Sequence, residues 1–313
     1  MRFADFVGSV FSMVDISYDF ALRIYEEFGR SWVREFVGWW VRGVVEGNEY
    51  FCRMTIAFYK YHGTGNDFVM IDNMAGEIHL TNEMVVSICD RHFGVGSDGL
   101  ILIEKSDDPQ VHFSMNFYNP DASKSFCGNG SRCAVSFAKM LGYVGEHVVF
   151  SAIDGVHEAI INEEIVSIRM RDVAVANRLS EDTYFLNTGS PHFIEFSPYV
   201  GSLDIISAAR PIRYSDAYKP GGTNVNYVEW MGEASVFVRT YERGVEDETL
   251  SCGTGVTAAA LACAFVKPQL SNVEVNTKGG KLEVSFFKNE SSFTNIFLKG
   301  PARFVFKGEI DLV

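Results

Sequence analysis

Residues 126–133 read Phe126-Cys127-Gly128-Asn129-Gly130-Ser131-Arg132-Cys133, a cysteine followed by a glycine-rich turn. The run before it, 119–123, is polar and turn-prone, and the run after it, 133–141, is apolar and rich in alanine. This order predicts a loop, a tight turn and then a helix, with Cys127 at the mouth of the helix. A second copy, Ser251-Cys252-Gly253-Thr254-Gly255, also precedes an alanine-rich run. The two copies predict two thiols that face each other across one substrate.

The two cysteine motifs belong to a longer internal repeat. Four motifs recur in the same order at offsets of 123 to 126 residues. The pairs are Thr64-Gly65-Asn66 with Thr188-Gly189-Ser190, Gly96-Ser97-Asp98 with Gly222-Thr223-Asn224, Tyr118-Asn119 with Tyr241-Glu242, and Cys127-Gly128-Asn129-Gly130 with Cys252-Gly253-Thr254-Gly255. A nearly constant offset over four motifs predicts a duplicated domain. The pattern favours two similar α+β domains that meet near residues 172–179, each contributing one helix mouth to a central cleft.

Short apolar runs between turn residues predict the strands of these domains. They lie at 56–61, 68–71, 99–103, 111–118, 148–150, 157–161, 164–170 and 236–241. Residues 82–89 predict a helix. The closely spaced strands after the first cysteine helix favour an antiparallel sheet.

Composition excludes several classes of protein. The chain has 313 residues, of which 47% are hydrophobic and 21% charged, as is typical of a globular protein. The net charge of -13 argues against general affinity for nucleic acid. The sequence has no run of 18 apolar residues, which argues against a membrane span. The six cysteines include no C-x-x-C pair, and no secretory signal is visible, so we expect reduced cytoplasmic thiols and no structural zinc.

Residues 1–53 differ in composition from the rest of the chain. They hold six arginines, no lysine and three of the four tryptophans. Apolar side chains between residues 3 and 14 follow helical spacing. One interpretation is an amphipathic helix that docks on a partner or a membrane surface. The other is an upstream extension that is not part of the folded enzyme, with Met54 as the true start.

The paired motifs carry a chemical prediction. The start of a helix leaves backbone N–H groups unpaired and is electropositive, and glycines let a ligand approach the backbone closely. Two such mouths can hold a carboxylate, and they should lower the pKa of Cys127 and Cys252 enough for a thiolate to act as a base. This favours removal of a proton from a carbon beside a carboxylate, with one thiol on each face. The alternative is that both cysteines are small buried residues.

Four other members of the repeat favour a polar substrate. Asn66 and Asn224 lie in glycine-rich turns, where they could bind a substrate or be solvated turn residues. Glu242 could hold an ammonium group and Arg243 a carboxylate, or the two could form a surface ion pair. No lysine stands in a pyridoxal-phosphate context, so the chemistry requires no cofactor. Three further cysteines lie in apolar helical patterns typical of core packing: Cys89, Cys133 and Cys263.

Seven motifs together resemble the diaminopimelate epimerase family, from about Met54 to the C-terminus. They are Gly63-Thr64-Gly65-Asn66-Asp67-Phe68, Gly94-Val95-Gly96-Ser97-Asp98-Gly99, Tyr118-Asn119-Pro120-Asp121, Cys127-Gly128-Asn129-Gly130, Gly222-Thr223-Asn224-Val225, Glu242-Arg243-Gly244 and Cys252-Gly253-Thr254-Gly255. The resemblance implies two pseudo-symmetric domains, each a β-barrel-like sheet around a central helix, with the active site in the interdomain cleft. It implies a first domain of residues 54–175 plus 301–313, to which the last strand returns, and a second domain of residues 176–300.

The resemblance also implies an activity. It is the interconversion of LL- and meso-2,6-diaminopimelate without pyridoxal phosphate or metal, on the route to lysine and peptidoglycan. Carried over by position, Cys127 and Cys252 are the base and acid. The backbones of Gly128-Asn129 and Gly253-Thr254 would hold the carboxylate at the reacting end of the substrate.

The remaining site residues follow from the same resemblance. Asn119 and Glu242 would take the ammonium group at the reacting end. Asn66, Asn224 and Arg243 would bind the amino acid group at the distal end. The family often forms dimers, so a homodimer is an expected assembly, although no interface is legible in the sequence.

The chain departs from the family pattern at two positions. Ser190 stands where the family usually has an asparagine, which shortens the side chain at the distal end. Ala122 stands where the family usually has a glycine, in the loop that carries Asn119.

Two rival functions stay open at this stage. One is a proline or hydroxyproline racemase of the same fold. Those enzymes typically have histidine where Asn129 stands and do not need Arg243 for a second carboxylate, so both residues favour diaminopimelate. The other rival is a non-catalytic thiol protein, which predicts no exchange of an α-proton.

Overall fold

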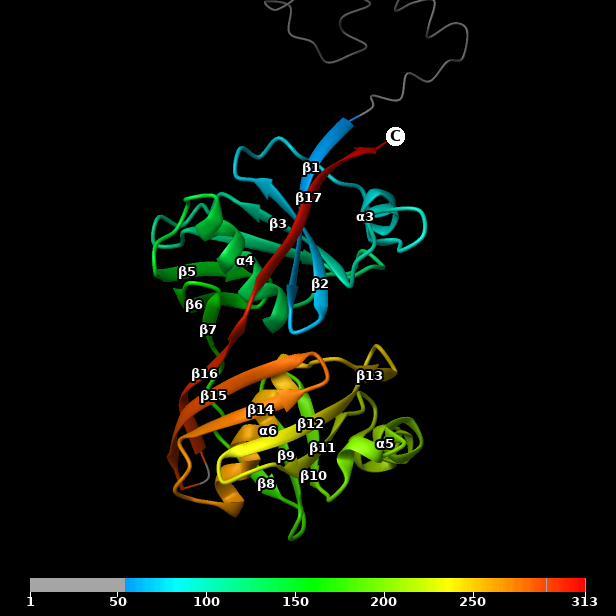
Figure 1. Cartoon of the computed structure of the whole chain (residues 1–313), viewed down its shortest axis with the longest axis vertical. Coiled ribbons are helices and arrows are strands. Elements are labelled where there is room, and N and C mark those ends of the chain that lie inside the picture. The colour runs from blue at the N-terminus through cyan, green and yellow to red at the C-terminus, as the bar shows by residue number, and fades with distance from the viewer. Residues whose placement is uncertain (1–53, 291, 313) are drawn as a thin grey trace, which may run out of the picture. The chain divides into compact units, whose positions relative to one another are not determined.

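The computed structural model describes residues 54–290 and 292–312, and the predictions for residues 1–53 lie outside this part of the chain. Residues Thr55–Leu312 form one compact unit. In this unit one continuous sheet of 17 strands curls around two long helices, one in each domain, and the antiparallel pairing of β7 (Ile165–Arg169) with β16 (Ser292–Pro301) joins the two halves (Figure 1). Within the described ranges, every helix is too short or too polar to cross a membrane.

The first domain contains the first seven strands, two helices and the last strand. Its elements are β1 (Met54–Gly63), β2 (Asn66–Asn73), α3 (Asn82–Cys89), β3 (Gly99–Glu104), β4 (Phe113–Tyr118), α4 (Gly128–Met140), β5 (His147–Ala152), β6 (Gly155–Asn162), β7 (Ile165–Arg169) and β17 (Arg303–Leu312).

The second domain contains the segments in between. Its elements are β8 (Ala176–Arg178), β9 (Thr183–Asn187), β10 (Pro191–Phe196), the short 3-10 helix η1 (Val200–Ser202), α5 (Ile205–Arg213), the 3-10 helix η2 (Asp216–Tyr218), β11 (Asn224–Trp230), β12 (Ser235–Glu242), β13 (Asp247–Thr249), α6 (Gly253–Val266), β14 (Asn272–Thr277), β15 (Gly280–Asn289) and β16 (Ser292–Pro301).

Strand pairing shows the duplication directly. From β1 to β7, successive strands pair antiparallel, parallel, antiparallel, parallel, antiparallel and antiparallel. The series β9, β10, β11, β12, β14, β15 and β16 repeats that order. Each parallel pair needs a crossover, and helices supply it: α3 and α4 in the first domain, α5 and α6 in the second. The predicted pair of pseudo-symmetric domains is therefore confirmed.

The two central helices are buried on nearly all sides. In α4 every residue from Gly128 to Val135 is buried, and in α6 burial extends from Val256 to Ala264. Helix α6 consists largely of alanine, glycine and threonine, so the surrounding strands can approach its backbone closely. A helix that is apolar around its whole circumference belongs in a core. The sheets therefore fix the N-terminal end of each helix, where the cysteines lie.

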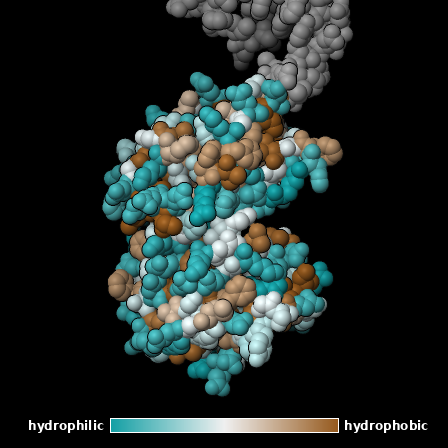
Figure 2. All heavy atoms as spheres, in the orientation of Figure 1, coloured by the Kyte–Doolittle hydropathy of each residue, from teal (hydrophilic) through white to brown (hydrophobic). Residues whose placement is uncertain are grey.

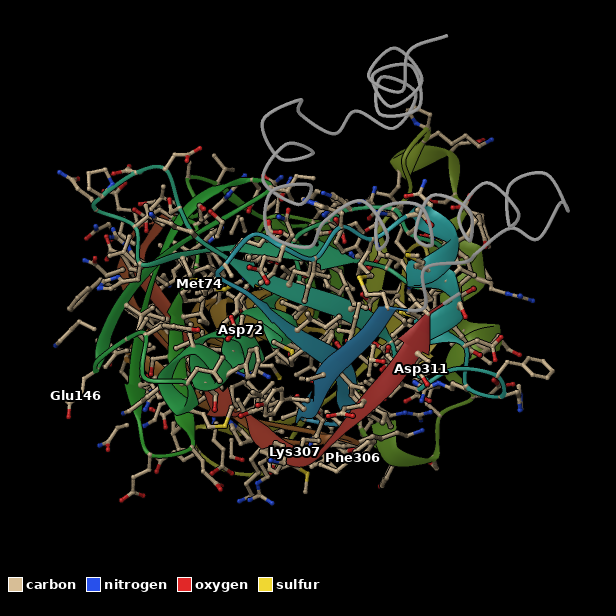
Figure 3. The ribbon with its side chains drawn as sticks, turned by 90° about the horizontal axis from the view of Figure 1, so that it is seen from above. Asp72, Met74, Glu146, Phe306, Lys307 and Asp311 are labelled. Atoms are coloured by element: carbon tan, nitrogen blue, oxygen red, sulfur yellow. The ribbon has the colours of Figure 1, made fainter. Side chains whose placement is uncertain are left out.

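The last strand returns to the first domain. Strand β17 pairs with β1, and β8 pairs with β9 at the equivalent place in the second domain. Figure 3 shows β17 beside β1, with Phe306, Lys307 and Asp311 along it. Phe306 contacts Phe58 edge to face, with ring centroids 5.9 Å apart. This pairing supports the proposed domain limits, 54–175 plus 301–313 and 176–300.

Candidate active site

The N-terminal ends of the two central helices meet. Cys127 is the N-cap of α4 and Cys252 is the N-cap of α6. A methyl group placed on Gly253 would lie 3.9 Å from the α-carbon of Gly128. The Asn129 side chain donates a hydrogen bond of 2.9 Å to the carbonyl oxygen of Ser251, so it joins the two cysteine loops directly. The structure thus brings the two predicted helix mouths together.

Two adjoining cavities open at this junction, where the surface is hollowed between the two domains (Figure 2). The larger has a volume of about 700 Å³ and the smaller about 420 Å³. Every predicted site residue lines one of them. The larger cavity is lined by Asn66, Asn119, Cys127, Gly128, Asn129 and Gly253. The smaller is lined by Ser190, Asn224 and Arg243. Both are lined by Glu242, Cys252 and Thr254.

The thiol of Cys127 is held at the start of α4. Its sulfur accepts a hydrogen bond of 3.4 Å from the backbone N–H of Gly130, as expected for a helix N-cap. The thiol donates to Oδ1 of Asn66 at 3.8 Å. That oxygen also accepts from Nδ2 of Asn129 at 3.2 Å. Asn66 therefore lies beside the Cys127 thiol and lines the larger cavity, whereas Asn224 and Arg243, with which it was predicted to bind the distal end, line the smaller one.

A chain of hydrogen bonds leads from Asn226 through His192 and Thr254 to the Cys252 thiol. Nδ2 of Asn226 donates to the Phe193 carbonyl, and Oδ1 of Asn226 accepts from the Thr240 hydroxyl, so the orientation of this amide is fixed. Nδ2 lies 3.1 Å from Nδ1 of His192, which must therefore accept. The other ring nitrogen carries the proton and donates to the Thr254 hydroxyl at 2.9 Å.

This chain directs the hydroxyl hydrogen of Thr254. Because that oxygen already accepts from His192, its own hydrogen can point to Sγ of Cys252, 3.5 Å away. His192 is fully buried, and burial, aided by the charge of Arg243, lowers its pKa to about 3. A neutral imidazole therefore orients the hydroxyl. The sequence alone did not assign His192 a role.

The predicted pKa shift of the two thiols is wrong for this state of the protein. Burial raises the pKa of Cys127 to about 11, although the backbone N–H of Gly130 opposes the shift. Burial raises the pKa of Cys252 further, and the negative charge of Glu242 adds to the effect on both thiols. Removal from water outweighs the electropositive helix ends, because a thiolate loses more hydration than the N–H groups replace. Both thiols are therefore neutral near neutral pH.

The residues predicted for the reacting ammonium group line the larger cavity. Glu242 accepts a hydrogen bond of 2.8 Å from the Thr249 hydroxyl, and burial raises its pKa. Asn119 donates to the hydroxyl oxygens of Ser123 and Ser125 at 3.0 and 3.2 Å. Its loop turns at Ala122, which has a positive φ of 65°. This is the conformation for which glycine is suited, so the family's usual glycine has a physical explanation.

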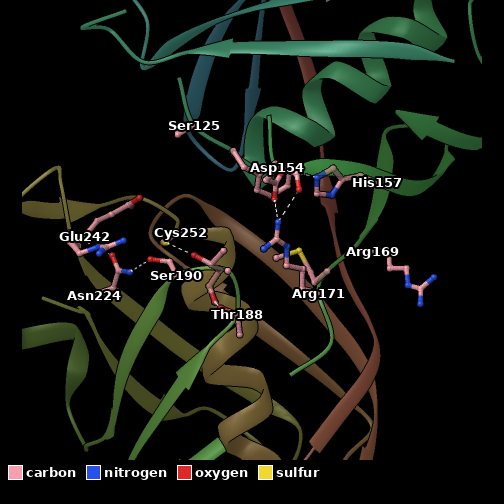
Figure 4. A pocket seen from close by; sticks show the side chains of 15 residues that line it. Ser125, Asp154, His157, Arg169, Arg171, Thr188, Ser190, Asn224, Glu242 and Cys252 are labelled. Atoms are coloured by element: carbon pink, nitrogen blue, oxygen red, sulfur yellow. Dashed lines mark hydrogen bonds and ion pairs between the residues drawn. The ribbon is translucent and has the colours of Figure 1, made fainter. Parts of the chain in front are cut away.

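The smaller cavity carries the residues predicted for the distal end (Figure 4). Nδ2 of Asn224 donates to the Ser190 hydroxyl at 2.8 Å, and Oδ1 of Asn224 accepts from the backbone N–H of Arg243 at 2.8 Å. Asn224 thus fastens the two other residues to each other. The Arg243 guanidinium is exposed and donates to the Gly221 carbonyl at 3.3 Å.

Sequence reasoning missed a second group of charged residues around the cavities. On the smaller cavity, Arg171 forms an ion pair of 2.8 Å with Asp154, whose other oxygen lies 2.8 Å from His157. On the larger, Arg91 bridges Asp67 and Asp98 at 2.7 and 2.6 Å. Asp98 lies within a repeated motif, which was the available signal. The others lie outside the repeat.

The cysteines assigned to the core are confirmed as buried residues. Cys89, Cys133 and Cys263 have exposed fractions of 3, 0 and 0%, and none lines either cavity. The five cysteines in the described part of the chain are all free thiols.

Comparison with known proteins agrees with this arrangement. The family described as diaminopimelate epimerase matches residues 58–174 and 184–305. A protein named diaminopimelate epimerase from Flavobacterium psychrophilum is 50% identical over 256 residues, covering 80% of this chain and 99% of its own.

Solved structures show the same fold at low identity. A phenazine biosynthesis protein of the PhzF family from Bacillus anthracis superposes with a TM-score of 0.66 at 15% identity, covering 83% of this chain and all of its own. A hydroxyproline epimerase from Agrobacterium vitis does so with a TM-score of 0.61 at 12% identity, covering 82% and 93%. These two show the fold alone, whereas the family match extends over most of the chain and includes both cysteine motifs. The chain therefore belongs to the diaminopimelate epimerase family.

Proposed function

We propose that this protein interconverts LL- and meso-2,6-diaminopimelate with two cysteines, one of which takes the α-proton while the other gives a proton to the opposite face of the carbon. The observation that carries the proposal is that Cys127 and Cys252, N-caps of the two central helices, line one cavity. Membership of the family supports the identity of the substrate. The reaction belongs to the synthesis of lysine and peptidoglycan precursors.

The proton balance needs one thiolate and one thiol. The thiolate takes the α-proton and becomes a thiol, and the electron pair of the broken C–H bond moves into the adjacent carboxylate. The second thiol then gives its proton to the opposite face of the carbon and becomes the thiolate. Backbone N–H groups at Gly128-Asn129 and Gly253-Thr254 would face the carboxylate as its charge increases. No electrons leave the system, so the step requires no redox cofactor.

Substrate binding supplies the activation that the empty cavity lacks. The charge of Glu242 raises the pKa of both thiols. An ammonium group between Glu242 and Asn119 would offset that charge and lower both thiol pKa values. A thiolate would then form when its counter-charge arrives.

The smaller cavity explains the need for a second amino acid group. Arg243 and Ser190 offer donors for a distal carboxylate and are held in place by Asn224, and Asp154 offers an acceptor for a distal ammonium. Proline and hydroxyproline have no second charged end, so they would leave these groups unpaired. We include in the proposal a cytoplasmic location, a homodimeric assembly and small molecules as the only substrates.

The test follows hydrogen at the α-carbon. Purified, reduced protein is incubated with LL-diaminopimelate in heavy water, and deuterium incorporation and the meso product are measured. We expect both, and expect neither with hydroxyproline. Absence of exchange would refute the proposal, and preferential turnover of hydroxyproline would favour a racemase instead.

Substitutions assign the two thiols. Cys127→Ser and Cys252→Ser should each lower turnover by several orders of magnitude, since a hydroxyl is a far weaker acid than a thiol. Cys263→Ala is the matched control, because Cys263 is a core residue of α6 outside both cavities. Near-normal turnover in either serine variant would remove that cysteine from the pair.

A further inference from the structure

Arg132 is a fully buried arginine in the second turn of α4. Its guanidinium donates to Oδ1 of Asn129 at 2.9 Å, to the Thr64 hydroxyl at 3.3 Å and to the Pro301 carbonyl at 3.4 Å. Its Nη1 has no hydrogen-bond partner in the described part of the chain. No carboxylate in residues 54–290 or 292–312 forms an ion pair with it. Burying a charge in this way costs several kcal/mol of folding free energy, so we expect the charge to have a functional role.

The ionisable groups closest in sequence to this charge are thiols. Cys127 and Cys133 both act electrostatically on the guanidinium. Cys133 is enclosed in the core, whereas Cys127 lines the larger cavity. The charge of Arg132 is therefore placed to act on a reacting group.

The internal repeat provides a built-in comparison. Arg132 follows Cys127 by five residues, and the residue that follows Cys252 by five is Thr257. Thr257 is also fully buried, but its hydroxyl donates to the Gly253 carbonyl within its own helix at 2.9 Å. The same place in the fold thus holds a positive charge behind one thiol and a neutral group behind the other.

A second pair in the repeat differs in the same direction. Asn119 in the first domain corresponds to Glu242 in the second. The first domain therefore has the neutral amide of Asn119 where the second has the carboxylate of Glu242. It also has the buried cation of Arg132 where the second has the neutral hydroxyl of Thr257. The other charged groups that line the larger cavity are Asp67, Arg91, Asp98 and Glu248.

Arg132 also sets the geometry of the thiol. By donating to Oδ1 of Asn129, it turns Nδ2 of that amide toward Oδ1 of Asn66 and the Ser251 carbonyl. Oδ1 of Asn66 is the acceptor of the Cys127 thiol hydrogen. Arg132 therefore both places a positive charge near Cys127 and fixes the amide groups that orient the Cys127 thiol.

We propose that Arg132 is a positioning residue that makes Cys127 the first thiol of the pair to lose its proton. This inference rests on the proposed function, because it assigns the two thiols of that reaction unequal roles. Burial and the charge of Glu242 raise the pKa of both thiols, whereas Arg132 lowers only that of Cys127, in agreement with the geometry.

The test measures thiol ionisation without substrate, so its result is independent of the proposed activity. Reduced full-length protein is treated with iodoacetamide over a series of pH values, and labelling of Cys127 and Cys252 is quantified by peptide mass spectrometry. In the wild type, the labelling rate of Cys127 should level off at a lower pH than that of Cys252. The reverse order would overturn the proposal. Because this measurement uses the wild-type protein, its result does not depend on whether a variant folds.

Variants then isolate the charge. Arg132→Met should lower Cys127 labelling by roughly three-fold or more at a given pH, since a nearby charge shifts a pKa by about one unit and nucleophilicity offsets about half of that. Arg132→Lys should keep most of the labelling, and Cys252 should serve as the unchanged internal reference. Thr257→Val is the matched control at the equivalent position. An unchanged Cys127 profile in Arg132→Met, or an equal change at both thiols, would show a structural role only.

Discussion

Replacing Gly255 with alanine tests whether the hydrogen-bond chain behind Cys252 is rigid. A β-carbon on Gly255 would lie 2.5 Å from Oδ1 of Asn226 and 3.3 Å from both Cε1 of His192 and Oγ1 of Thr240. All three neighbours are buried, so the methyl group has no open direction. By contrast, a β-carbon on Gly128, in the first cysteine motif, would meet only a methyl group of Leu298 at 3.9 Å.

The expected loss of stability follows from the hydrogen bonds of Asn226 that must shift. Asn226 would have to retreat by about 1 Å to reach an ordinary contact distance, which disrupts its bonds to Thr240 and His192. Each buried polar group left unsatisfied costs about 1–3 kcal/mol. The higher helix propensity of alanine returns at most about 1 kcal/mol. We therefore expect Gly255→Ala to lower the free energy of unfolding by about 2–4 kcal/mol and Gly128→Ala to change it by less than about 1 kcal/mol.

Urea denaturation followed by circular dichroism measures both variants under the same conditions. The slope of the unfolding transition should stay unchanged if the effect is confined to the native state. Equal stability of the two alanine variants would show that the hydrogen-bonded residues around His192 can move to make room for the methyl group. The inference that His192 fixes the direction of the Thr254 hydroxyl would then lose its support.

Three further predictions follow from single positions. Ala122→Gly should raise the free energy of unfolding by about 1 kcal/mol in urea denaturation, because Ala122 has a φ of 65°, and a loss of stability would contradict this. The pKa of His192 is depressed to about 3, so its contribution to stability is present above about pH 6.5 and is lost as the pH falls toward 3. The difference in unfolding free energy between wild type and His192→Gln should therefore shrink in acid, by up to about 1.4 kcal/mol per pH unit; a constant difference would argue against a neutral buried ring. Arg243→Lys should lower kcat/KM for diaminopimelate about tenfold or more by losing paired donation to a carboxylate, and unchanged kinetics would place the distal carboxylate elsewhere.

The features that the sequence predicted well are those with local causes. Thr81 caps α3 by accepting from the N–H of Met84, so the helix begins and ends where the pattern indicated, at 82–89. The cysteine motifs predicted both helix starts because a glycine-rich turn before an alanine-rich run has few other solutions. The predicted strand at 111–118 begins two residues later, at Phe113, because the N–H of Val111 closes a turn onto Asp108.

The features that the sequence did not predict depend on distant contacts or on burial. The residue pattern alone does not place strand β17, which has exposed side chains from Arg303 to Lys307 and no clear alternation; only the family resemblance implied its return to the first domain, where it pairs with β1. The predicted lowering of the thiol pKa values was wrong because the prediction considered only the helix start. The surrounding strands remove the thiols from water, and this burial raises their pKa values. Arg132 lay in the first quoted motif, but its importance appears only when its burial is known.

The duplicated fold places a constraint on how the two thiols can differ. Both occupy the N-cap of a buried central helix, and burial raises the pKa of both. The backbone therefore cannot assign one to be thiolate and the other thiol, although the reaction needs one of each at the start of every turnover. The difference must come from side chains that the repeat does not preserve. Two such pairs stand beside the cysteines, Arg132 with Thr257 and Asn119 with Glu242: the charge of Arg132 lowers the pKa of Cys127, and the charge of Glu242 ranks higher among the causes that raise the pKa of Cys252 than among those of Cys127. The symmetric fold thus supplies two opposed faces, and two unrepeated charges decide which face gives up its proton first.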